Sequence, residues 1–325
     1  MTHFLQIVWN PSEGINIGSF TLHFYSLMFV VAFVLGWFIM KPIYKRENEP
    51  MEKLDSLLFY MFLAILIGAR LGDVIFYNWS SYYPDHLLEI FLPIRENPNA
   101  TLFYFIKGWE FTGFRGLASH GAAIAVIITM YFYTTKVLKR PILWILDRVV
   151  IPVASGAIFV RLGNFFNSEI YGPIVSGKPF YGVKFIREDE FWMDKNIHQL
   201  TQTNDLNKAY KLIETDSAFA QTLNAIPFRH PSQLYEAFGY VFVFAILFFL
   251  YWKTDARQKQ GFLFGMFLIM LFSVRILVEF VKESQGGFES DLGQLSNLLS
   301  TGQWLSIPFI IAGLFFVFRA KKEVV

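Results

Sequence analysis

The chain of 325 residues contains no cysteine. This absence excludes disulfides, thiolate metal sites and a cysteine nucleophile, so any thiol in the chemistry has to come from a substrate. Charged residues are also scarce, at 17%, whereas soluble domains carry about 25%. The first lysine or arginine is Lys41, so we expect no signal peptide with a basic leading region. Dinucleotide-binding, P-loop and zinc motifs are absent as well, and we expect neither a cofactor nor a metal.

Hydrophobic residues, by contrast, make up 54% of the chain and include 38 phenylalanines. Seven apolar segments are each close to the ~20 residues that a helix needs to cross a bilayer. They run roughly over residues 20–40, 57–77, 117–135, 142–160, 234–252, 262–281 and 304–318, and the last is the shortest. The sequence therefore predicts an all-α polytopic membrane protein with about seven transmembrane helices.

Basic residues are concentrated in alternate loops between these segments. The basic loops contain Lys41, Lys45, Arg46, Lys53, Lys136, Lys139, Arg140, Lys253, Arg257, Lys259, Arg319, Lys321 and Lys322. Residues 1–19 and 283–300 contain no lysine or arginine, and the loop 78–114 contains only Arg95 and Lys107. Because cytoplasmic loops are enriched in lysine and arginine, we expect the N-terminus outside and the C-terminus in the cytoplasm.

One long segment, residues 173–229, is too polar to lie in a membrane, and we expect it to form a small external arm or head domain of mixed structure. Its stretch PFYGVKFI predicts a strand, and DLNKAYKLIETDSAFAQTLN predicts a helix. The sequence is thus divided into residues 1–172 with four transmembrane helices, the arm 173–229, and residues 230–325 with three more.

Several ionisable residues fall inside or at the ends of the apolar segments, where a charge costs about 2.5–3.5 kcal/mol at a helix centre. They are Arg70, Asp73, His120, Asp147, Arg148, Arg161, Glu169, Glu236, Arg275 and Glu279. Asp147 and Arg148 lie near the predicted cytoplasmic start of a helix, and we expect them to be structural. The others lie nearer the predicted outer face.

Each of these has a structural and a functional interpretation. Arg70 and Asp73 are three residues apart on one helix, so they either form an internal ion pair or belong to a site. His120 either makes a structural hydrogen bond or transfers a proton, since its pKa lies close to ~6.5. Arg275 and Glu279 either neutralise each other or form a unit in which the carboxylate orients the guanidinium toward an anion.

The polar stretch VRLGNFFNSEIYG follows the fourth apolar segment. It contains Arg161, Asn164, Asn167 and Glu169 between two glycines, Gly163 and Gly172. The glycines suggest a backbone that bends back toward the helices. Together with Arg275, Arg161 brings positive charge to the outer face without enough obvious local counter-charge, and a phospholipid headgroup is the anion available there.

These motifs together resemble the prolipoprotein diacylglyceryl transferases. The matching positions are Arg161, Gly163, Asn164, Phe165, Asn167, Glu169 and Gly172 in the signature, His120–Gly121, Gly68–Asn78, His230–Glu236, Arg275, Glu279 and the first-helix Tyr25. The chain departs from the family pattern at Asp73, Ala122, Pro173 and Leu271.

The resemblance implies transfer of the diacylglyceryl group of phosphatidylglycerol to the lipobox cysteine in the signal peptide of a prolipoprotein, with release of glycerol phosphate. It implies His120, Arg161 and Arg275 as catalytic residues, and Arg161, Asn164, Asn167, Tyr25 and Arg275 as headgroup ligands. It implies Glu169, Gly172, Glu279, Arg70, Tyr235 and Glu236 as supporting residues. Glu169 and Glu279 would hold the arginines, although Glu169 could instead contact the peptide or lead the chain into the arm.

The same resemblance implies a bacterial inner-membrane protein whose site faces the outer leaflet, with membrane lipids but no nucleic acid among its partners. Two alternatives remain on the residues alone. One is a transporter or flippase for an anionic lipid or solute, and the other is a lipid-binding scaffold without activity. Within the enzyme interpretation, an arginine could activate the thiol and leave His120 structural.

Overall fold

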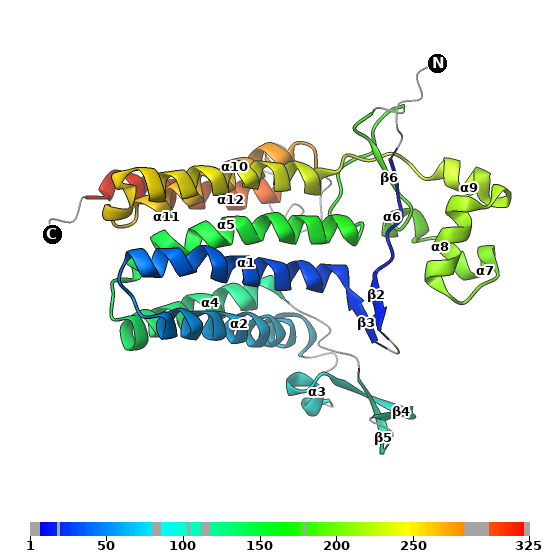
Figure 1. Cartoon of the computed structure of the whole chain (residues 1–325). Helices are drawn as coiled ribbons and strands as arrows, with labels where there is room; N and C mark the ends of the chain where they lie inside the picture. The colour runs from blue at the N-terminus through cyan, green and yellow to red at the C-terminus, as the bar shows by residue number, and fades with distance from the viewer. Residues whose placement is uncertain are drawn as a thin grey trace. The chain divides into compact units, whose positions relative to one another are not determined.

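A computed structural model describes residues 7–17, 20–79, 86–102, 105–111, 118–177, 180–282 and 299–321, with backbone only at Asn16, Ile17, Phe20, Tyr77, Ser119 and His120. The long helices are α1 (Phe24–Arg46), α2 (Met51–Asp73), α4 (Ser119–Phe132), α5 (Ile142–Phe166), α10 (Ser232–Lys253), α11 (Phe262–Glu279) and α12 (Thr301–Arg319). Within the described residues, seven helical segments are long and apolar enough to cross a membrane (Figure 1). The prediction of a seven-helix membrane protein is confirmed.

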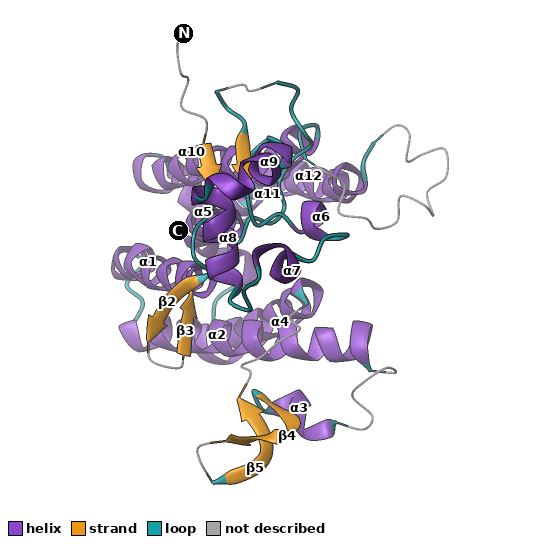
Figure 2. Cartoon of the chain, turned by 90° about the vertical axis from the view of Figure 1, so that its right-hand side faces the viewer, coloured by secondary structure: helices purple, strands orange, loops and turns teal. Residues whose placement is uncertain are grey.

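The remaining elements are short. The small helices are α3 (Leu87–Phe91), α6 (Asp189–Trp192), α7 (Ile197–Thr201), α8 (Leu206–Thr215) and α9 (Ala220–Ala225). The strands are β1 (Ile7–Trp9), β2 (Gly14–Ile17), β3 (Phe20–His23), β4 (Ile94–Leu102), β5 (Ile106–Phe111) and β6 (Val183–Phe185). They pair two by two, β1 with β6 in parallel and β2 with β3 and β4 with β5 in antiparallel fashion, so helix dominates the described part of the chain (Figure 2).

Several predicted boundaries of the transmembrane helices are wrong. The first helix continues past Met40 to Arg46, and the second begins at Met51 rather than Leu57. The first helix begins at Phe24 rather than Phe20, because residues 20–23 pair with β2 as strand β3. The fourth continues past Val160 to Phe166. Polarity begins at Arg161 but the helix does not end there, because polar side chains with partners inside a protein are compatible with helical backbone.

In the arm, the predicted strand is confirmed as β6, and the single predicted helix is divided in two. Helix α8 ends at Thr215, and the side chain of Asp216 accepts a hydrogen bond from the backbone N–H of Ala218 at 2.9 Å. A short aspartate side chain that bonds to its neighbouring backbone competes with the helical pattern, which explains the break. The arm has its own core, made of Ile186, Trp192, Ile197, Ala209, Tyr210, Ile213 and Ile226.

The chain divides into two compact units, residues 41–145 and residues 1–40 with 146–325, and each is described by itself. In the first, α2 and α4 approach closely through glycines. A β-carbon on Gly121 would lie 2.5 Å from the Cα of Gly72, and one on Gly72 would lie 2.6 Å from the Cα of Gly121. Small residues at both positions are therefore what allows these two backbones to touch.

In the second unit, Asp147 fixes α5 to the start of α11. Its two carboxylate oxygens accept hydrogen bonds from the backbone N–H groups of Gly261 at 2.7 Å and Phe264 at 2.9 Å. Arg148 donates to the carbonyl of Arg257 at 3.5 Å. The Asp147 bonds satisfy N–H groups that the first turn of a helix leaves free, and the Arg148 bond holds the segment before α11, so both residues make the structural contacts that were predicted.

Replacing Gly121 with alanine should destabilise the protein by about 1–3 kcal/mol, because the added methyl group overlaps the α2 backbone. Gly156→Ala is the matched control, since its added β-carbon would lie 3.6 Å from Ala32, an ordinary contact. Thermal unfolding of both purified variants in detergent measures the difference. Equal melting temperatures for the two variants would contradict the close contact of α2 and α4.

Candidate functional site

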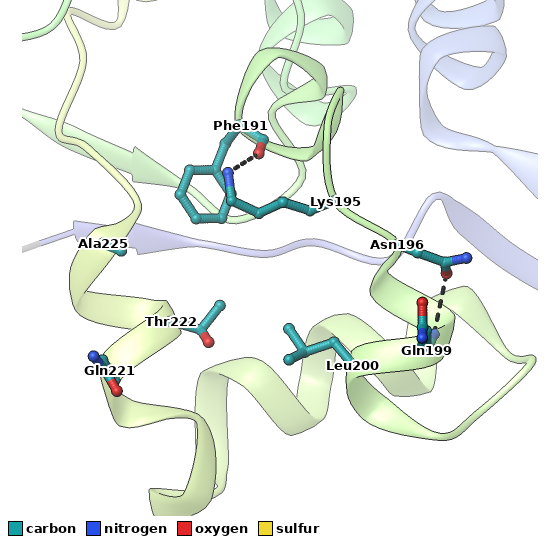
Figure 3. A pocket seen from close by; sticks show the side chains of 8 residues that line it. All are labelled: Phe191, Lys195, Asn196, Gln199, Leu200, Gln221, Thr222 and Ala225. Carbon is teal, nitrogen blue, oxygen red and sulfur yellow. Dashed lines mark hydrogen bonds between the residues drawn. The ribbon is translucent and has the colours of Figure 1, made fainter.

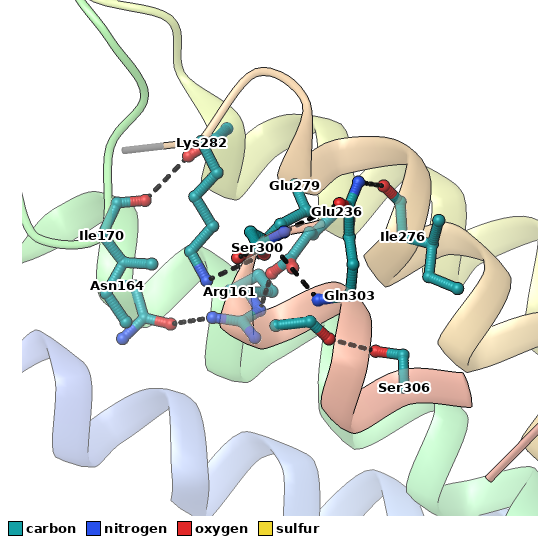
Figure 4. Close-up of polar contacts among 12 residues, drawn as sticks. Arg161, Asn164, Ile170, Glu236, Ile276, Glu279, Lys282, Ser300, Gln303 and Ser306 are labelled. Atoms are coloured by element: carbon teal, nitrogen blue, oxygen red, sulfur yellow. Dashed lines mark hydrogen bonds and ion pairs between the residues drawn. The ribbon is translucent and has the colours of Figure 1, made fainter. Parts of the chain in front are cut away.

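The predicted site residues of the second unit are centred on Arg161, near the end of α5. Its guanidinium Nε pairs with the carboxylate of Glu236 on α10, and its Nη1 donates to Asn164 Oδ1 at 3.3 Å (Figure 4). The Glu236 side chain is only 2% exposed and that of Arg161 14%. A buried pair of opposite charges, braced by an amide, holds the guanidinium in one orientation.

Asn164 extends this contact to the loop after α5. Its amide nitrogen donates to Glu169 Oε1 at 2.8 Å, and the exposed Asn167 reaches the same oxygen at 3.5 Å. The prediction that Glu169 holds Arg161 directly is therefore wrong. Glu236 makes that ion pair, and Glu169 acts on Arg161 through Asn164. Asn164 lies three residues after Arg161 in α5, so the two side chains share one face of the helix, and the Asn164 amide can contact both Arg161 and Glu169.

Tyr25 on α1 joins the same cluster. A β-carbon on Gly163 would lie 2.8 Å from the Cδ2 atom of the Tyr25 ring, so the glycine leaves space for that ring. It does not bend the backbone, because Gly163 lies inside helix α5. The side chains of Glu169, Arg161 and Asn164 all lie close enough to act on the tyrosine hydroxyl. The predicted grouping of Tyr25 with Arg161 and Asn164 agrees with this geometry.

The loop that follows is held in an unusual conformation by the start of α10. Ser168 and Ile170 have positive φ angles of 56° and 60°, which non-glycine residues adopt at a cost. Ser232 Oγ donates to the carbonyl of Ile170 at 2.8 Å, and Gln233 Nε2 to that of Glu169 at 2.7 Å. These two bonds fix the loop, so Gln233 and Ser232 position the residues that contact Asn164.

Gly172 closes the loop. A β-carbon there would lie 2.7 Å from the β-carbon of His230, and the Gly172 N–H donates to the His230 carbonyl at 2.8 Å. The glycine is therefore required by the close approach of the two backbones at the base of the arm. Its predicted supporting role is consistent with this position.

Arg275 and Glu279 lie on α11, but their contacts differ from the prediction that Glu279 holds Arg275. Glu279 Oε1 accepts from Ser300 Oγ at 3.0 Å, and a β-carbon on Gly302 would lie 2.5 Å from the Glu279 carboxyl carbon. The carboxylate thus lies against the N-terminus of α12, where the helix dipole favours an anion. The Nε atom of Arg275 is buried and has no hydrogen-bond partner among the described residues.

Four residues of this cluster were not among the predicted site residues. Tyr240, buried one turn after Glu236, lies within reach of Arg161 and Arg275. Lys282, just after α11, lies beside Glu279, while Ser300 and Gln303 form the capping box of α12. The capping pattern S-x-x-Q could have been recognised in the sequence, but its link to Glu279 could not, because residues far apart in the chain supply it.

The other predicted residues have different surroundings. Arg70 Nη1 lies 3.6 Å from Asp73 Oδ2, so the ion pair within α2 is present. Arg70 also donates to the backbone carbonyls of Glu89 and Ile90, and these bonds hold α3 to α2. The Tyr235 hydroxyl lies 3.3 Å from Nδ1 of His230, which stacks on Tyr181. His120 and Arg70 belong to the unit 41–145, and the side chain of His120 lies outside the described atoms.

The arm contains a separate hollow of about 600 Å³ (Figure 3). It is lined by Phe191, Lys195, Asn196, Gln199, Leu200, Gln221, Thr222 and Ala225. Lys195 Nζ bonds to the carbonyl of Phe191 at 2.7 Å, and Asn196 accepts from the backbone of Gln199 at 3.0 Å. No predicted site residue lines this hollow, and two of its polar side chains, Lys195 and Asn196, take part in these local bonds, so the Arg161 cluster is the candidate site.

Comparison with known proteins agrees with the motifs. The model of the prolipoprotein diacylglyceryl transferase family matches residues 13–319. A phosphatidylglycerol–prolipoprotein diacylglyceryl transferase of Tolumonas auensis is 34% identical over 98% of this chain and 99% of its own length. Proteins of the same name from Bacteroides fragilis, 32% identical over 98% and 97%, and Chloroherpeton thalassium, 33% over 98% and 95%, are similar along almost the whole chain.

Replacing Glu236 with glutamine should lower the free energy of unfolding by about 3 kcal/mol, because Arg161 is then left as a buried charge without its counter-ion. Glu214→Gln is the control, since Glu214 is exposed and an exposed substitution is expected to stay within ~0.5 kcal/mol. Unfolding in detergent measures both. If Glu236→Gln lost no more stability than the control, the ion pair would not be the bond that fixes Arg161.

Proposed function

The chain belongs to the prolipoprotein diacylglyceryl transferase family, and on that basis we propose that the Arg161 cluster binds the headgroup of phosphatidylglycerol and transfers its diacylglyceryl group to the lipobox cysteine of a prolipoprotein. Membership makes the protein a transferase that spans a membrane with seven apolar helices. It gives no support to the alternative of a transporter or flippase.

The observation that carries the assignment of the site is the environment of its two arginines. Arg161 is oriented by Glu236 and Asn164, and Arg275 presents a buried Nε without a partner among the described residues. Guanidinium groups bind phosphate through paired hydrogen bonds, and such bonds are strongest where water is excluded. Asn164, Asn167 and Tyr25 orient the glycerol of the headgroup, and Glu236 and Glu169 keep Arg161 and Asn164 in position.

In the proposed reaction, the cysteine thiol loses its proton and the sulfur attacks the glyceryl carbon that carries the phosphate. The carbon–oxygen bond breaks, a thioether forms, and glycerol phosphate leaves with the bonding electrons. The leaving phosphate gains one negative charge, and fixed cations already aimed at it lower the barrier. The chain has no cysteine, which agrees with a peptide that supplies the sulfur.

His120 is the proposed base for the thiol, whose free pKa is near ~8.5. A histidine is suited to this step because its own pKa lies close to neutral pH. It is supported by the position of His120 in the first turn of α4, next to Gly121. The alternative, in which an arginine lowers the thiol pKa and His120 is structural, predicts a different effect of its replacement.

The location we propose is the inner membrane of a bacterium, with the site toward the outer leaflet. It is supported by the charges of the short loops. Those on the same side as the ends of α5 and α11 are poor in lysine and arginine, and the long arm is left out because long loops say little about orientation. The arm 173–229 begins and ends beside the site, at Gly172 and His230, so we propose that it receives the peptide.

The function is tested by incubating the purified protein with phosphatidylglycerol and a lipobox peptide. We expect a gain in peptide mass equal to one diacylglyceryl group, together with released glycerol phosphate. A transporter or a lipid-binding scaffold gives neither product.

Replacing His120 with glutamine should lower kcat about 100-fold or more, the usual contribution of a general base, and should remove the acid limb of the pH profile. The matched control is His198→Gln in the exposed part of the arm, which should be neutral. Near-normal turnover of the His120 variant across the pH range would exclude the base and favour activation by an arginine.

Arg161→Lys should lower kcat about 100-fold even though it keeps the charge, because lysine cannot form the paired bonds to phosphate while it also contacts Glu236. Arg319→Lys, at the exposed end of α12, is the control. Turnover is measured in the same assay. Activity of Arg161→Lys close to that of the control would show that charge alone is sufficient at this position.

A further inference from the structure

Lys282 is an unusual lysine for its place in the chain. It follows α11, whose last residue is Glu279, and yet its side chain is only 7% exposed. Figure 4 shows it folded back over Glu279 and Ser300, toward the guanidinium of Arg161. Lysines at helix ends normally extend their ammonium group into water, so a buried one needs a reason.

The simplest structural explanation is that Lys282 neutralises the C-terminus of α11. Its contacts do not fit this role well. Its nearest described carboxylate oxygen, Glu279 Oε2, is 4.0 Å away, at the limit of an ion pair. Glu279 in turn already accepts a hydrogen bond from Ser300 at the start of α12. The ammonium group, with three donors, thus has no close hydrogen-bond acceptor among the described residues.

The charges around it point to an anion. Four charged groups of the cluster lie close enough to act on Lys282: the carboxylates of Glu236 and Glu279 and the guanidinium groups of Arg161 and Arg275. Burial lowers the pKa of the Lys282 ammonium below its usual value, the two carboxylates oppose this and the two arginines add to it. With these four groups and Lys282 ionised, one positive charge is left over, which matches a bound phosphodiester with a single negative charge. Glu169, which is bonded to Asn164, is not among the groups that act on Lys282.

We propose that Lys282 is a third phosphate-binding residue of this site and that it acts mainly on the departing glycerol phosphate. This rests on the function proposed above. As the carbon–oxygen bond to the glyceryl carbon breaks, its electron pair stays on the phosphate oxygen, and the phosphate passes from one negative charge to two. The two arginines balance the charge of the bound lipid, and Lys282 supplies a flexible cation that follows the oxygen as it leaves.

The test compares Lys282→Met, which keeps length and burial but removes the charge, with Lys282→Arg, which keeps the charge. Lys253→Met, at the exposed end of α10, is the matched control. Three quantities are measured on purified protein: kcat and KM with phosphatidylglycerol and a lipobox peptide, inhibition by added glycerol phosphate, and the rise in melting temperature that glycerol phosphate causes.

For Lys282→Met we expect kcat to fall about 100-fold with a much smaller change in KM, because the charge is needed after the lipid is bound. Inhibition by glycerol phosphate should weaken about 10-fold or more, and its thermal shift should shrink equally. Lys282→Arg should recover most of both properties, and Lys253→Met should behave as the unchanged protein.

The inference is overturned if Lys282→Met keeps normal kcat and normal inhibition, or if Lys282→Arg is as impaired as Lys282→Met, since packing rather than charge would then matter. Failure of the proposed function looks different. The unchanged protein would then form no lipidated peptide, while the thermal shift by glycerol phosphate would still decide whether Lys282 binds a phosphate.

Discussion

The ion pair between Arg161 and Glu236 is the interaction on which the rest of the site depends. It joins the end of α5 to the start of α10, two helices separated in the chain by the whole arm. The arm must therefore leave and return at nearly the same place, and its base is closed by backbone bonds between Gly172 and His230 and between Val183 and Arg229. One buried pair thus fixes both the proposed phosphate-binding cation and the geometry at the base of the arm.

Around this pair, each polar residue has a second residue that determines its orientation. Asn164 is held by Arg161 on one side and Glu169 on the other, and the backbone of Glu169 is held by Gln233. Positive φ angles at Ser168 and Ile170 cost free energy, and the hydrogen bonds from α10 offset it. The loop of the candidate site is therefore held in a strained conformation that fixes the positions of its side chains.

Much of the fold could be predicted from the sequence because a bilayer restricts the options. Apolar runs of ~20 residues have to be helices there, so all seven were recognised, and the motif residues near Arg161 were grouped correctly with Tyr25. The partners of the charges could not be predicted. Glu169 and Glu279 were assigned to the arginines because they are nearby in sequence, whereas the contacts formed are set by how α10 and α12 pack, which no local pattern encodes.

Polar residues at the start of helices α5 and α11 differ in their contacts from those near the ends of the same helices. At the start of α5, both carboxylate oxygens of Asp147 accept hydrogen bonds from backbone N–H groups at the start of α11. The carboxylate therefore holds the two helices together. At the other end the described contacts leave Arg275 Nε, Glu236 Oε1 and Gln233 Oε1 buried without partners. A buried polar atom that lacks a partner costs about 1–3 kcal/mol. Buried atoms of this kind also occur elsewhere in the described chain, for example at Asp73 Oδ2. What distinguishes the end near Arg161 is that three of them lie in the cluster that also holds the arginines, so a ligand with its own donors and acceptors is expected to bind there.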